Sequence, residues 1–254
     1  MHACLFDLDG TLIESKQIWY NLLNNCRMYF GYRELIYDEW QSTFGQSMEM
    51  NRQRYFPNQT QQQINDYCDR HYIDQIQYLQ VFERSADILK YCSNKYNNNV
   101  VCVTNCPRLI TQVILPRTDF SQYFTHVVCS RDVVNYDVSQ LYTHMDNSRH
   151  TSSGIDTADL HDINMSIHTN GISAHNNQHN NNTELKYSLK PKKSPDTLLH
   201  ACKLLDIHPS EAYFIGDTSH DMEAAAAAGC IGIGINVDGG KYKINDIGEL
   251  TTII

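Results

Sequence analysis

Residues 3–11 read ACLFDLDGT: a short apolar run at residues 3–8 includes Asp7, and Asp9, Gly10 and Thr11 follow it. Such a run, followed at Gly10 by a residue that permits a sharp turn, is typical of a buried strand and the turn after it. Because side chains alternate along an extended strand, Asp7 and Asp9 are expected to point to the same side. Two neighbouring carboxylates repel each other, and sharing a divalent cation relieves that repulsion. The end of the first strand is therefore a candidate cation site.

Short β-branched segments and helical segments alternate over much of the remaining chain, and this alternation predicts a parallel sheet with helices on both faces. We therefore expect an α/β fold with a doubly wound, Rossmann-like core. Residues 15–98 interrupt the alternation with mostly helical spacing. The further strands are predicted at residues 100–105, 125–130, 213–217 and 231–235, and the helices between them at about 107–115, 196–205 and 221–228.

Residues 139–186 differ in composition from the rest of the chain. Only 12 of these 48 residues are hydrophobic, eight are Asn and six are His. Such a segment cannot bury enough apolar surface to offset the conformational entropy that is lost on ordering. We therefore predict a disordered, low-complexity insertion within the core. The spacing of the six His residues matches no metal-ligand pattern, which makes metal binding there the weaker alternative.

Charge and cysteine usage exclude several classes of protein. The 254 residues include 20 basic and 29 acidic residues, a net charge of −9, and no Lys/Arg run, which argues against a nucleic-acid or anionic-membrane partner. No apolar stretch reaches the roughly 18 residues of a membrane span, and the first residues lack the pattern of a secretory signal. The nine Cys residues are scattered without a C-x-x-C pair, so we expect neither a disulfide framework nor structural zinc. We therefore expect a cytoplasmic protein.

Polar residues also follow two other predicted strands. Thr104 and Asn105 come at the end of one, and GDTSHD at 216–221 follows another, directly before a helix. Because ligands of a parallel α/β sheet bind outside the carboxyl ends of its strands, these groups are expected to meet the two carboxylates of the first strand. Each also has a simpler interpretation by itself. The DLDGT motif could be a turn with a helix cap, and Asp221 could be the N-cap of the helix that follows.

Taken together and in this order, these motifs resemble those of the haloacid dehalogenase superfamily, and more narrowly its phosphoglycolate-phosphatase-like branch. The resemblance rests on FDLDGTLIES at 6–15, on VTNCPRLITQVIL at 103–115, and on KKSPDTLLHACKLL and FIGDTSHDMEAAAAAG within 192–229. It covers about residues 1–135 and 187–240, and it leaves out the insertion.

The resemblance implies a mechanism that is carried by four carboxylates. Asp7 would be the nucleophile that attacks phosphorus and forms an aspartyl-phosphate. Asp9 would be the general acid that protonates the leaving oxygen and then the base that activates water, and its backbone carbonyl would bind Mg²⁺. The carboxylates of Asp7 and Asp217 would also bind Mg²⁺, with Asp221 as a direct or water-mediated ligand.

The phosphate group would be held by Thr104, by backbone N–H groups near Asn105 and by a lysine. The family pattern for that lysine is K-P-x-P-D, whereas this chain reads KPKKSPD at 190–196. Counting back four residues from the aspartate selects Lys192, and counting from the Lys-Pro pair selects Lys190. We favour Lys192, because the segment that follows matches without a gap, and Lys190 stays the alternative.

By the same resemblance, residues 15–85 would form a small helical cap inserted after the first motif. Such a cap closes over the site, excludes water and contacts the leaving group. The candidate contact region is FGQS at 44–47, with Arg52 or Arg54 as an anion partner. The α/β core would then be residues 1–14 and 86–254.

The expected function is Mg²⁺-dependent hydrolysis of a small phosphomonoester, similar to phosphoglycolate, through an aspartyl-phosphate. The partner would be a small phosphorylated metabolite, with no nucleic acid or membrane involved. Two alternatives are a phosphoglucomutase-type sugar phosphotransferase with the same core residues, and a catalytically idle interaction protein on the same fold. A dehalogenase is disfavoured, because that reaction has no need of the second acidic residue, Asp9. The sequence leaves open the substrate, the cap residues that select it and the oligomeric state.

Overall fold

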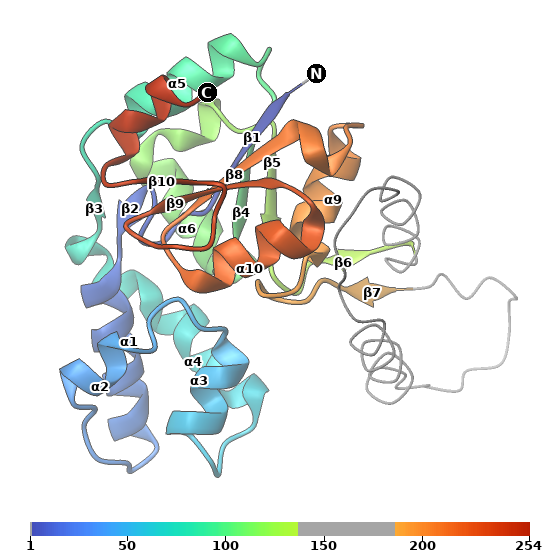
Figure 1. Ribbon diagram of the computed structural model, residues 1–254. Coiled ribbons are helices and arrows are strands. Elements are labelled where there is room, and N and C mark those ends of the chain that lie inside the picture. The colour runs from blue at the N-terminus through green and yellow to red at the C-terminus, as the bar shows by residue number, and fades with distance from the viewer. Residues whose placement is uncertain (1, 137–185) are drawn as a thin grey trace, which may run out of the picture. The chain divides into compact units, whose positions relative to one another are not determined.

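The structure of the protein, a computed structural model, describes residues 2–136 and 186–254 (Figure 1). The chain divides into two units, and the first of them holds the sheet, the helices and the candidate site. The first unit is formed by Met1–Val134 and Tyr187–Ile254, and the second by Asn135–Lys186.

A six-stranded sheet forms the centre of the first unit, and every strand pairs with its neighbours in parallel. This arrangement confirms the predicted α/β fold with a Rossmann-like core. The strand order is β10-β9-β8-β1-β4-β5. The bounds are β1 (Ala3–Phe6), β4 (Val100–Thr104), β5 (His126–Cys129), β8 (Ala212–Gly216), β9 (Ile231–Ile235) and β10 (Tyr242–Ile244).

The register of the central strands brings their carboxyl ends to one edge of the sheet. Phe6 of β1 lies opposite Cys102 of β4 on one side and Ile215 of β8 on the other. The Asp7 N–H still donates to the Ile215 carbonyl at 2.9 Å, so Asp7 leaves the sheet beside the end of β8. The polar residues that follow the three strands are therefore neighbours in space.

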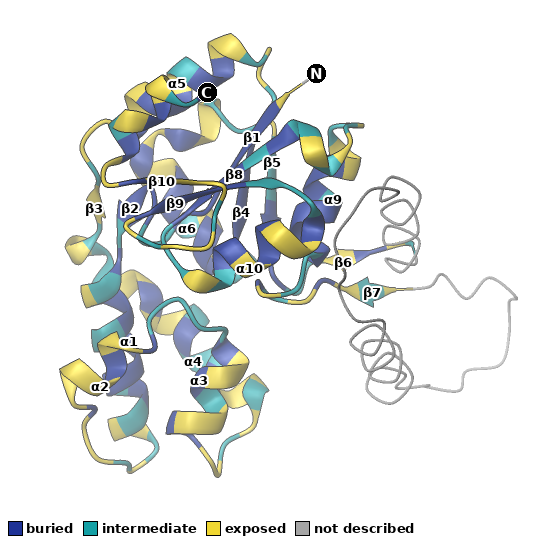
Figure 2. Ribbon diagram, viewed as in Figure 1, coloured by how far each residue is buried: buried dark blue, intermediate teal, exposed yellow. Residues whose placement is uncertain are grey.

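Helices cover the sheet on both faces, and Figure 2 shows the central strands buried between them. On one face, α9 (Asp196–Leu204) and α10 (Ser219–Ala228) contact each other and the strands. On the other face, α5 (Ser85–Lys95) packs on β4 and on the 3₁₀ helix η4 (Ile247–Thr252). In the described parts of the chain, none of the helices combines the length and the apolar character that crossing a bilayer requires.

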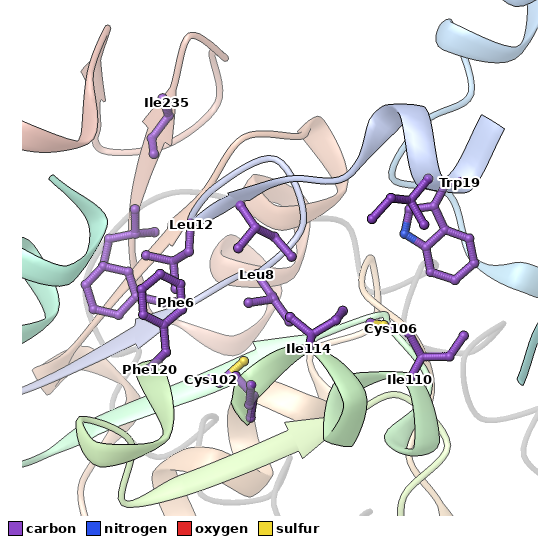
Figure 3. Packing of buried hydrophobic residues seen from close by; sticks show 14 of the residues in the cluster. Phe6, Leu8, Leu12, Trp19, Cys102, Cys106, Ile110, Ile114, Phe120 and Ile235 are labelled. Carbon is purple, nitrogen blue, oxygen red and sulfur yellow. The ribbon is translucent and has the colours of Figure 1, made fainter. Parts of the chain in front are cut away.

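A continuous hydrophobic cluster joins the sheet to the helices α5 and α6 (Arg108–Thr118). Figure 3 shows Phe6 of β1, Cys102 of β4 and Ile114 of α6 in this cluster, and Trp19 near one end of the group. Phe6 and Cys102 are fully buried, as expected for strands that are covered on both faces.

The alanine-rich sequence of α10 allows this helix to pack closely on the sheet. Alanine has the highest helix propensity, and its short side chain lets the helix lie close to the sheet. A Cβ added at Gly232 of β9 would lie 3.2 Å from the Cβ of Ala225, so the two elements meet through small residues. The helix ends at Gly229, whose φ of +77° is the left-handed conformation that glycine adopts at helix ends.

A helical segment, residues 16–78, is inserted between β1 and β4. The chain enters it through β2 (Ile13–Glu14) and returns through β3 (Gln80–Val81), and these two short strands pair with each other in the antiparallel direction. The chain therefore enters and leaves the helical segment at the same place. The elements of the helical segment are α1 (Lys16–Tyr29), α2 (Tyr37–Gln41), α3 (Met48–Tyr55), α4 (Gln61–His71) and the 3₁₀ helix η1 (Tyr72–Tyr78).

A second antiparallel pair joins β6 (Val133–Val134) to β7 (Tyr187–Ser188). The Arg131 N–H extends the pairing by donating to the Leu189 carbonyl at 2.7 Å. The pair ties the chain that follows Leu189 to the end of β5. The predicted disordered insertion at 139–186 lies outside the described residues, apart from its last residue, and stays a prediction.

Candidate active site

The turn after β1 holds Asp7 and Asp9 at the edge of the sheet. Asp7 is buried, and Gly10 turns the chain with a φ of +88°. A Cβ on Gly10 would overlap the carboxylate of Asp217, so glycine is required here by the close approach of two strand ends as well as by its conformation. Thr11, the next residue, donates its hydroxyl hydrogen to Asp217 Oδ1 at 3.1 Å.

The loop after β8 places Asp217 and Asp221 beside this turn. Thr218 is the N-cap of α10 and forms a capping box with Asp221, whose backbone N–H donates to the Thr218 hydroxyl at 3.3 Å. The interpretation of Asp221 as the N-cap is therefore wrong, because the helix begins at Ser219 and Asp221 lies in its first turn. A Cβ on Gly216 would lie 2.5 Å from the Cβ of Asp221, so this strand end also requires glycine.

Three carboxylates from these two loops form one cluster. Oxygen atoms of Asp7, Asp217 and Asp221 all lie within 4.8 Å of one another. Burial, together with the nearby charge of Asp221, raises the pKa of Asp217 to about 7. Burial also raises the pKa of Asp7 well above its ordinary value, although the Lys192 ammonium opposes that shift. The cluster holds more negative charge than its buried position favours, which is typical of a cation site.

Lys192 is the cation that reaches this cluster. Its ammonium is buried and contacts Asp7 and, at 2.7 Å, Asp221 Oδ1. Burial alone would lower the pKa of Lys192, but Asp221 and Asp7 raise it above its ordinary value. Lys190 is exposed, and its backbone N–H donates to Asp196 at 3.1 Å. The structure therefore brings Lys192, and not Lys190, to the carboxylates.

Asp196 holds the loop that carries Lys192 in place. Its buried carboxylate accepts hydrogen bonds from the Tyr187 hydroxyl at 2.9 Å and from the Ser194 hydroxyl at 2.6 Å. The backbone N–H of Lys192 donates to Asn105 Oδ1 at 2.8 Å. In the sequence, Asp196 served only as the residue from which the position of the lysine was counted. Its supporting role was not predicted.

Thr104 and Asn105 lie at the end of β4, on the other side of Asp7 from β8. The Thr104 hydroxyl oxygen accepts from the Cys106 N–H at 3.0 Å, which leaves the hydroxyl hydrogen available to a ligand. The Ser130 hydroxyl donates to the Asn105 carbonyl at 2.9 Å and fixes this turn. Both residues line the same cavity as Asp7, as their positions at the strand end predict.

Asp9 lies apart from the carboxylate cluster and faces the helical segment. Its Oδ1 accepts hydrogen bonds from the Ser15 hydroxyl and, at 3.1 Å, from the indole N–H of Trp19. Burial raises the pKa of Asp9, although these two hydrogen bonds oppose the shift. Asp9 can therefore hold a proton more readily than a carboxyl in water, and Ser15 and Trp19 keep it oriented. Sequence reasoning identified neither partner.

A cavity of about 60 Å³ connects these groups to the helical segment. Phe44, Gly45 and Gln46 of the predicted contact region line it, whereas Ser47 caps α3 by accepting a hydrogen bond from the Met50 N–H. The cavity lining comprises Asp7, Asp9, Trp19, Leu23, Trp40, Thr43, Phe44, Gly45, Gln46, Met48, Asn51, Thr104, Asn105, Cys106, Pro107, Lys192 and Thr218.

The two arginines that were expected as anion partners do not reach this cavity. The Arg52 guanidinium donates to the Gln59 carbonyl at 3.3 Å, and the Arg54 guanidinium lies 5.6 Å from the ring centre of Tyr55. Neither residue belongs to the cavity lining. The expectation that either would contact an anionic group of the substrate is therefore wrong for this structure.

Comparison with known proteins agrees with this arrangement. A family model described as haloacid dehalogenase-like hydrolase matches residues 4–155, more than half of the chain, and a second model of the same description matches residues 159–229. The chain belongs to the haloacid dehalogenase-like hydrolases. The first match includes Asp7, Asp9, Thr104 and Asn105.

Relatives and solved structures of this hydrolase family extend the comparison. The phosphoglycolate phosphatase of Chromobacterium violaceum is 38% identical over 69 residues, which are 24% of this chain and 31% of that protein. That of Thiobacillus denitrificans is 50% identical over 42 residues, 16% of this chain and 18% of that protein. The matches thus span less than a third of the curated relatives' length.

Two solved structures match the fold over nearly the whole chain. CbbY from Rhodobacter sphaeroides, in complex with phosphate, matches with a TM-score of 0.66 at 14% identity. The match covers 98% of this chain and 96% of the CbbY chain. A haloacid dehalogenase-like family hydrolase from Streptococcus pneumoniae matches with a TM-score of 0.64 at 18% identity. That match covers 100% of this chain and 98% of the Streptococcus pneumoniae chain. These likenesses show that the hydrolase shares their fold.

Gly45 joins the helical segment of this hydrolase to the core, and its replacement gives a first test. Its φ is +85°, an added Cβ would lie 2.7 Å from Thr218 Cγ2, and the His220 ring hydrogen-bonds to its backbone. We expect Gly45→Ala to push the loop away from Thr218, open the cavity and lower kcat/KM for hydrolysis by about tenfold. Steady-state kinetics would measure this loss.

Gly31→Ala is the matched control for Gly45→Ala. Gly31 has a similar φ of +79°, but an added Cβ there meets nothing within 4 Å. Both variants introduce a similar backbone strain of about 1 kcal/mol. Only in Gly45→Ala does the added Cβ also contact a residue of the core, Thr218. An equal fall of kcat/KM in the two variants would show that the contact with Thr218 has no special importance.

Proposed function

We propose that this chain is a Mg²⁺-dependent phosphatase that hydrolyses a small phosphomonoester through an aspartyl-phosphate on Asp7. The observation that carries the proposal is the contact of the Lys192 ammonium with Asp7 inside the carboxylate cluster. A nucleophile beside a buried ammonium and a cation site is shielded from the negative charge of a phosphate dianion. The curated relatives are named phosphoglycolate phosphatases, so phosphoglycolate is the first ester to assay.

The carboxylate cluster fits Mg²⁺ by its donor chemistry. Asp7, Asp217 and Asp221 offer oxygen ligands within 4.8 Å of one another, and Mg²⁺ prefers oxygen ligands and keeps several waters. In the proposal, the backbone carbonyl of Asp9 is a further ligand. The raised pKa values of Asp7 and Asp217 reflect burial and crowding of like charges, which a divalent cation relieves. When bound, Mg²⁺ supplies charge neutralisation of both the phosphate and the nucleophile.

Two proton transfers by Asp9 accompany two displacements at phosphorus. In the first, an oxygen of Asp7 bonds to phosphorus, the bond to the leaving oxygen breaks, and Asp9 gives that oxygen a proton. In the second, Asp9 takes a proton from water, whose oxygen attacks phosphorus and frees Asp7 and inorganic phosphate. The raised pKa of Asp9 suits it to hold the first proton. Lys192 and the Thr104 hydroxyl donate hydrogen bonds to the phosphoryl oxygens.

We also propose that residues 15–85 act as a cap on a core of residues 1–14 and 86–254. The antiparallel pairing of β2 with β3 supports this division, because it holds both connections of the helical segment at one place. The cavity lining supports it as well, since residues of α1 and α3 face Asp7 and Asp9. A cap in this position would exclude water from the aspartyl-phosphate and would contact the leaving group.

Metal dependence tests the assignment of the carboxylate cluster. We expect excess EDTA to abolish phosphate release, and Ca²⁺ to substitute poorly because it favours longer bonds and higher coordination numbers. Asp217→Asn removes one anionic ligand, so the Mg²⁺ concentration for half-maximal rate should rise by at least about tenfold. The control is Asp238→Asn, because Asp238 is exposed, pairs with Lys243 and is not one of the clustered carboxylates. Full activity in EDTA would contradict the metal assignment.

Phosphate release also separates hydrolysis from the other functions that the sequence allowed. A sugar phosphotransferase would convert a hexose 1-phosphate into the 6-phosphate without net release of inorganic phosphate. An idle interaction protein would release none from any ester. The proposal therefore requires inorganic phosphate and free alcohol in equal amounts from at least one small phosphomonoester.

A further inference from the structure

The wall of the cavity that faces away from the sheet is apolar and aromatic. It is formed by side chains of the helical segment, among them both tryptophans of the chain. Trp40 is buried and its ring lies 5.6 Å from that of Phe44 in an edge-to-face arrangement. Met48, from the first turn of α3, and Leu23, from α1, complete this apolar wall. The apolar wall is thus Trp19, Leu23, Trp40, Phe44 and Met48.

Among the described residues that line the cavity, Lys192 is the one cation, and it lies on the phosphate side. Among the described residues that line it, the only charged ones are Asp7, Asp9 and Lys192, and Lys192 already contacts two carboxylates. Lys16 lies 5.5 Å from the ring centre of Phe44 without lining the cavity. A second anionic group on the substrate would therefore find no second cation in this lining, but only neutral side chains and the carboxylate of Asp9. Burying a carboxylate without a cation partner is costly.

The side-chain oxygen of Asn51, in the helical segment, is free to contact a ligand at this wall. Asn51 lines the cavity and is 8% exposed, and its Oδ1 has no hydrogen-bond partner within residues 2–136 and 186–254. The nearby Thr43 hydroxyl is already occupied by the Trp40 carbonyl and the Tyr55 hydroxyl, each at 2.8 Å. A buried amide without a partner is unfavourable, so a ligand that hydrogen-bonds to Asn51 is stabilised.

We infer that the substrate is a phosphomonoester of a small uncharged alcohol, with an apolar face against the apolar wall and one hydroxyl that hydrogen-bonds to Asn51. The inference rests on the proposed phosphatase activity and narrows its substrate. It places the phosphate beside Lys192 and the carbon chain beside Trp40, Phe44 and Met48. It also disfavours esters whose leaving group carries a carboxylate, and phosphoglycolate is one of these.

Three esters of equal length test the inference on the unmodified protein. 2-Hydroxyethyl phosphate, n-propyl phosphate and phosphoglycolate share a phosphate–O–CH2 unit and differ only in the group on that carbon, which is hydroxymethyl, ethyl or carboxylate, respectively. We expect kcat/KM with Mg²⁺ to be highest for the hydroxyethyl ester and at least about tenfold lower for phosphoglycolate. A kcat/KM for phosphoglycolate that equals or exceeds the others would overturn the inference and leave the phosphatase proposal standing.

Substitutions at the wall test which residues set the preference. Met48→Lys introduces a cation, so it should shift the kcat/KM ratio toward phosphoglycolate by about tenfold or more. Met50→Lys is the matched control, because Met50 lies on the same turn of α3 but is exposed and outside the lining. Asn51→Leu should reverse the order of the hydroxyethyl and propyl esters. If Met50→Lys shifts the ratio as much as Met48→Lys does, the wall does not select the leaving group.

Binding gives a readout that does not depend on turnover. The two tryptophans of the chain both line the cavity, so their fluorescence reports its occupation. In the Asp7→Asn variant, we expect 2-hydroxyethyl phosphate to quench this fluorescence at a Kd at least about tenfold below that of phosphoglycolate. Absence of turnover by the unmodified protein, together with this order of binding by the variant, would reject the phosphatase proposal alone. Equal or reversed Kd values, or no binding of either ester, would reject the inference.

Discussion

Asp7→Asn is expected to lower phosphate release by at least about four orders of magnitude, because it removes the nucleophile and leaves no other route to the aspartyl-phosphate. The amide keeps the shape of the carboxylate in a buried position. Steady-state release of inorganic phosphate with Mg²⁺ measures this loss. Trapping of a phosphorylated protein by rapid acid quench should succeed with the unmodified chain and fail with the variant.

The same variant should be at least as stable as the unmodified protein. Burial raises the pKa of Asp7, and the charges of Asp221 and Asp217 add to that effect, so the folded state disfavours the ionised carboxylate. A neutral amide removes this repulsion, and Lys192 keeps its contact with Asp221 at 2.7 Å. The melting temperature in metal-free buffer should be unchanged or higher. Appreciable activity in this folded variant would remove Asp7 from its proposed role.

Lys192→Met is expected to have the second largest effect, with a loss of turnover of about 100- to 1000-fold. The substitution keeps the length of the side chain and removes the ammonium that contacts Asp7 and Asp221. Two buried carboxylates then lose their cation, which should lower the free energy of unfolding by about 3–5 kcal/mol in metal-free buffer. Phosphate release and denaturant unfolding would measure the two effects separately.

Lys190→Met is the matched control, because Lys190 is exposed and lies two residues from Lys192. It should leave turnover and stability nearly unchanged. The double variant Asp7→Asn with Lys192→Met should be more stable than Lys192→Met alone, since one of the two uncompensated carboxylates is then neutral. A large loss of turnover in Lys190→Met with none in Lys192→Met would reverse the assignment of the lysine.

Part of the fold could not be predicted because the segments involved are too short or too polar. β10 adds a strand at the edge of the sheet, but it has only three residues, and two of them are exposed. An edge strand needs little apolar surface, so its sequence does not show the continuous apolar run of a central strand. The β2–β3 and β6–β7 pairs have two residues in each strand, which is too short for an alternating pattern to be recognised.

The sequence by itself determined the α/β class and the carboxylate end of the site. Each of these rests on short-range chemistry: an apolar run makes a buried strand, and a glycine next to an aspartate ends it. Once the strands are parallel, their carboxyl ends must lie at one edge, so Asp7, Thr104 and Asp217 meet whatever the loops between them do. The structure agrees with this deduction, and burial together with the neighbouring charge of Asp221 raises the pKa of Asp217 at that edge.

Only the tertiary structure decided which residues complete the site. Lys190 and Lys192 are two residues apart in similar sequence, and the Asn105 side chain that binds the backbone of Lys192 is far away in the chain. In the helical segment, an apolar side chain such as Trp19 has the same periodicity whether it faces another helix or a cavity. Its hydrogen bond to Asp9 follows from the pairing of β2 with β3, which sets where α1 begins. These contacts depend on packing between distant segments, and no local pattern encodes that packing.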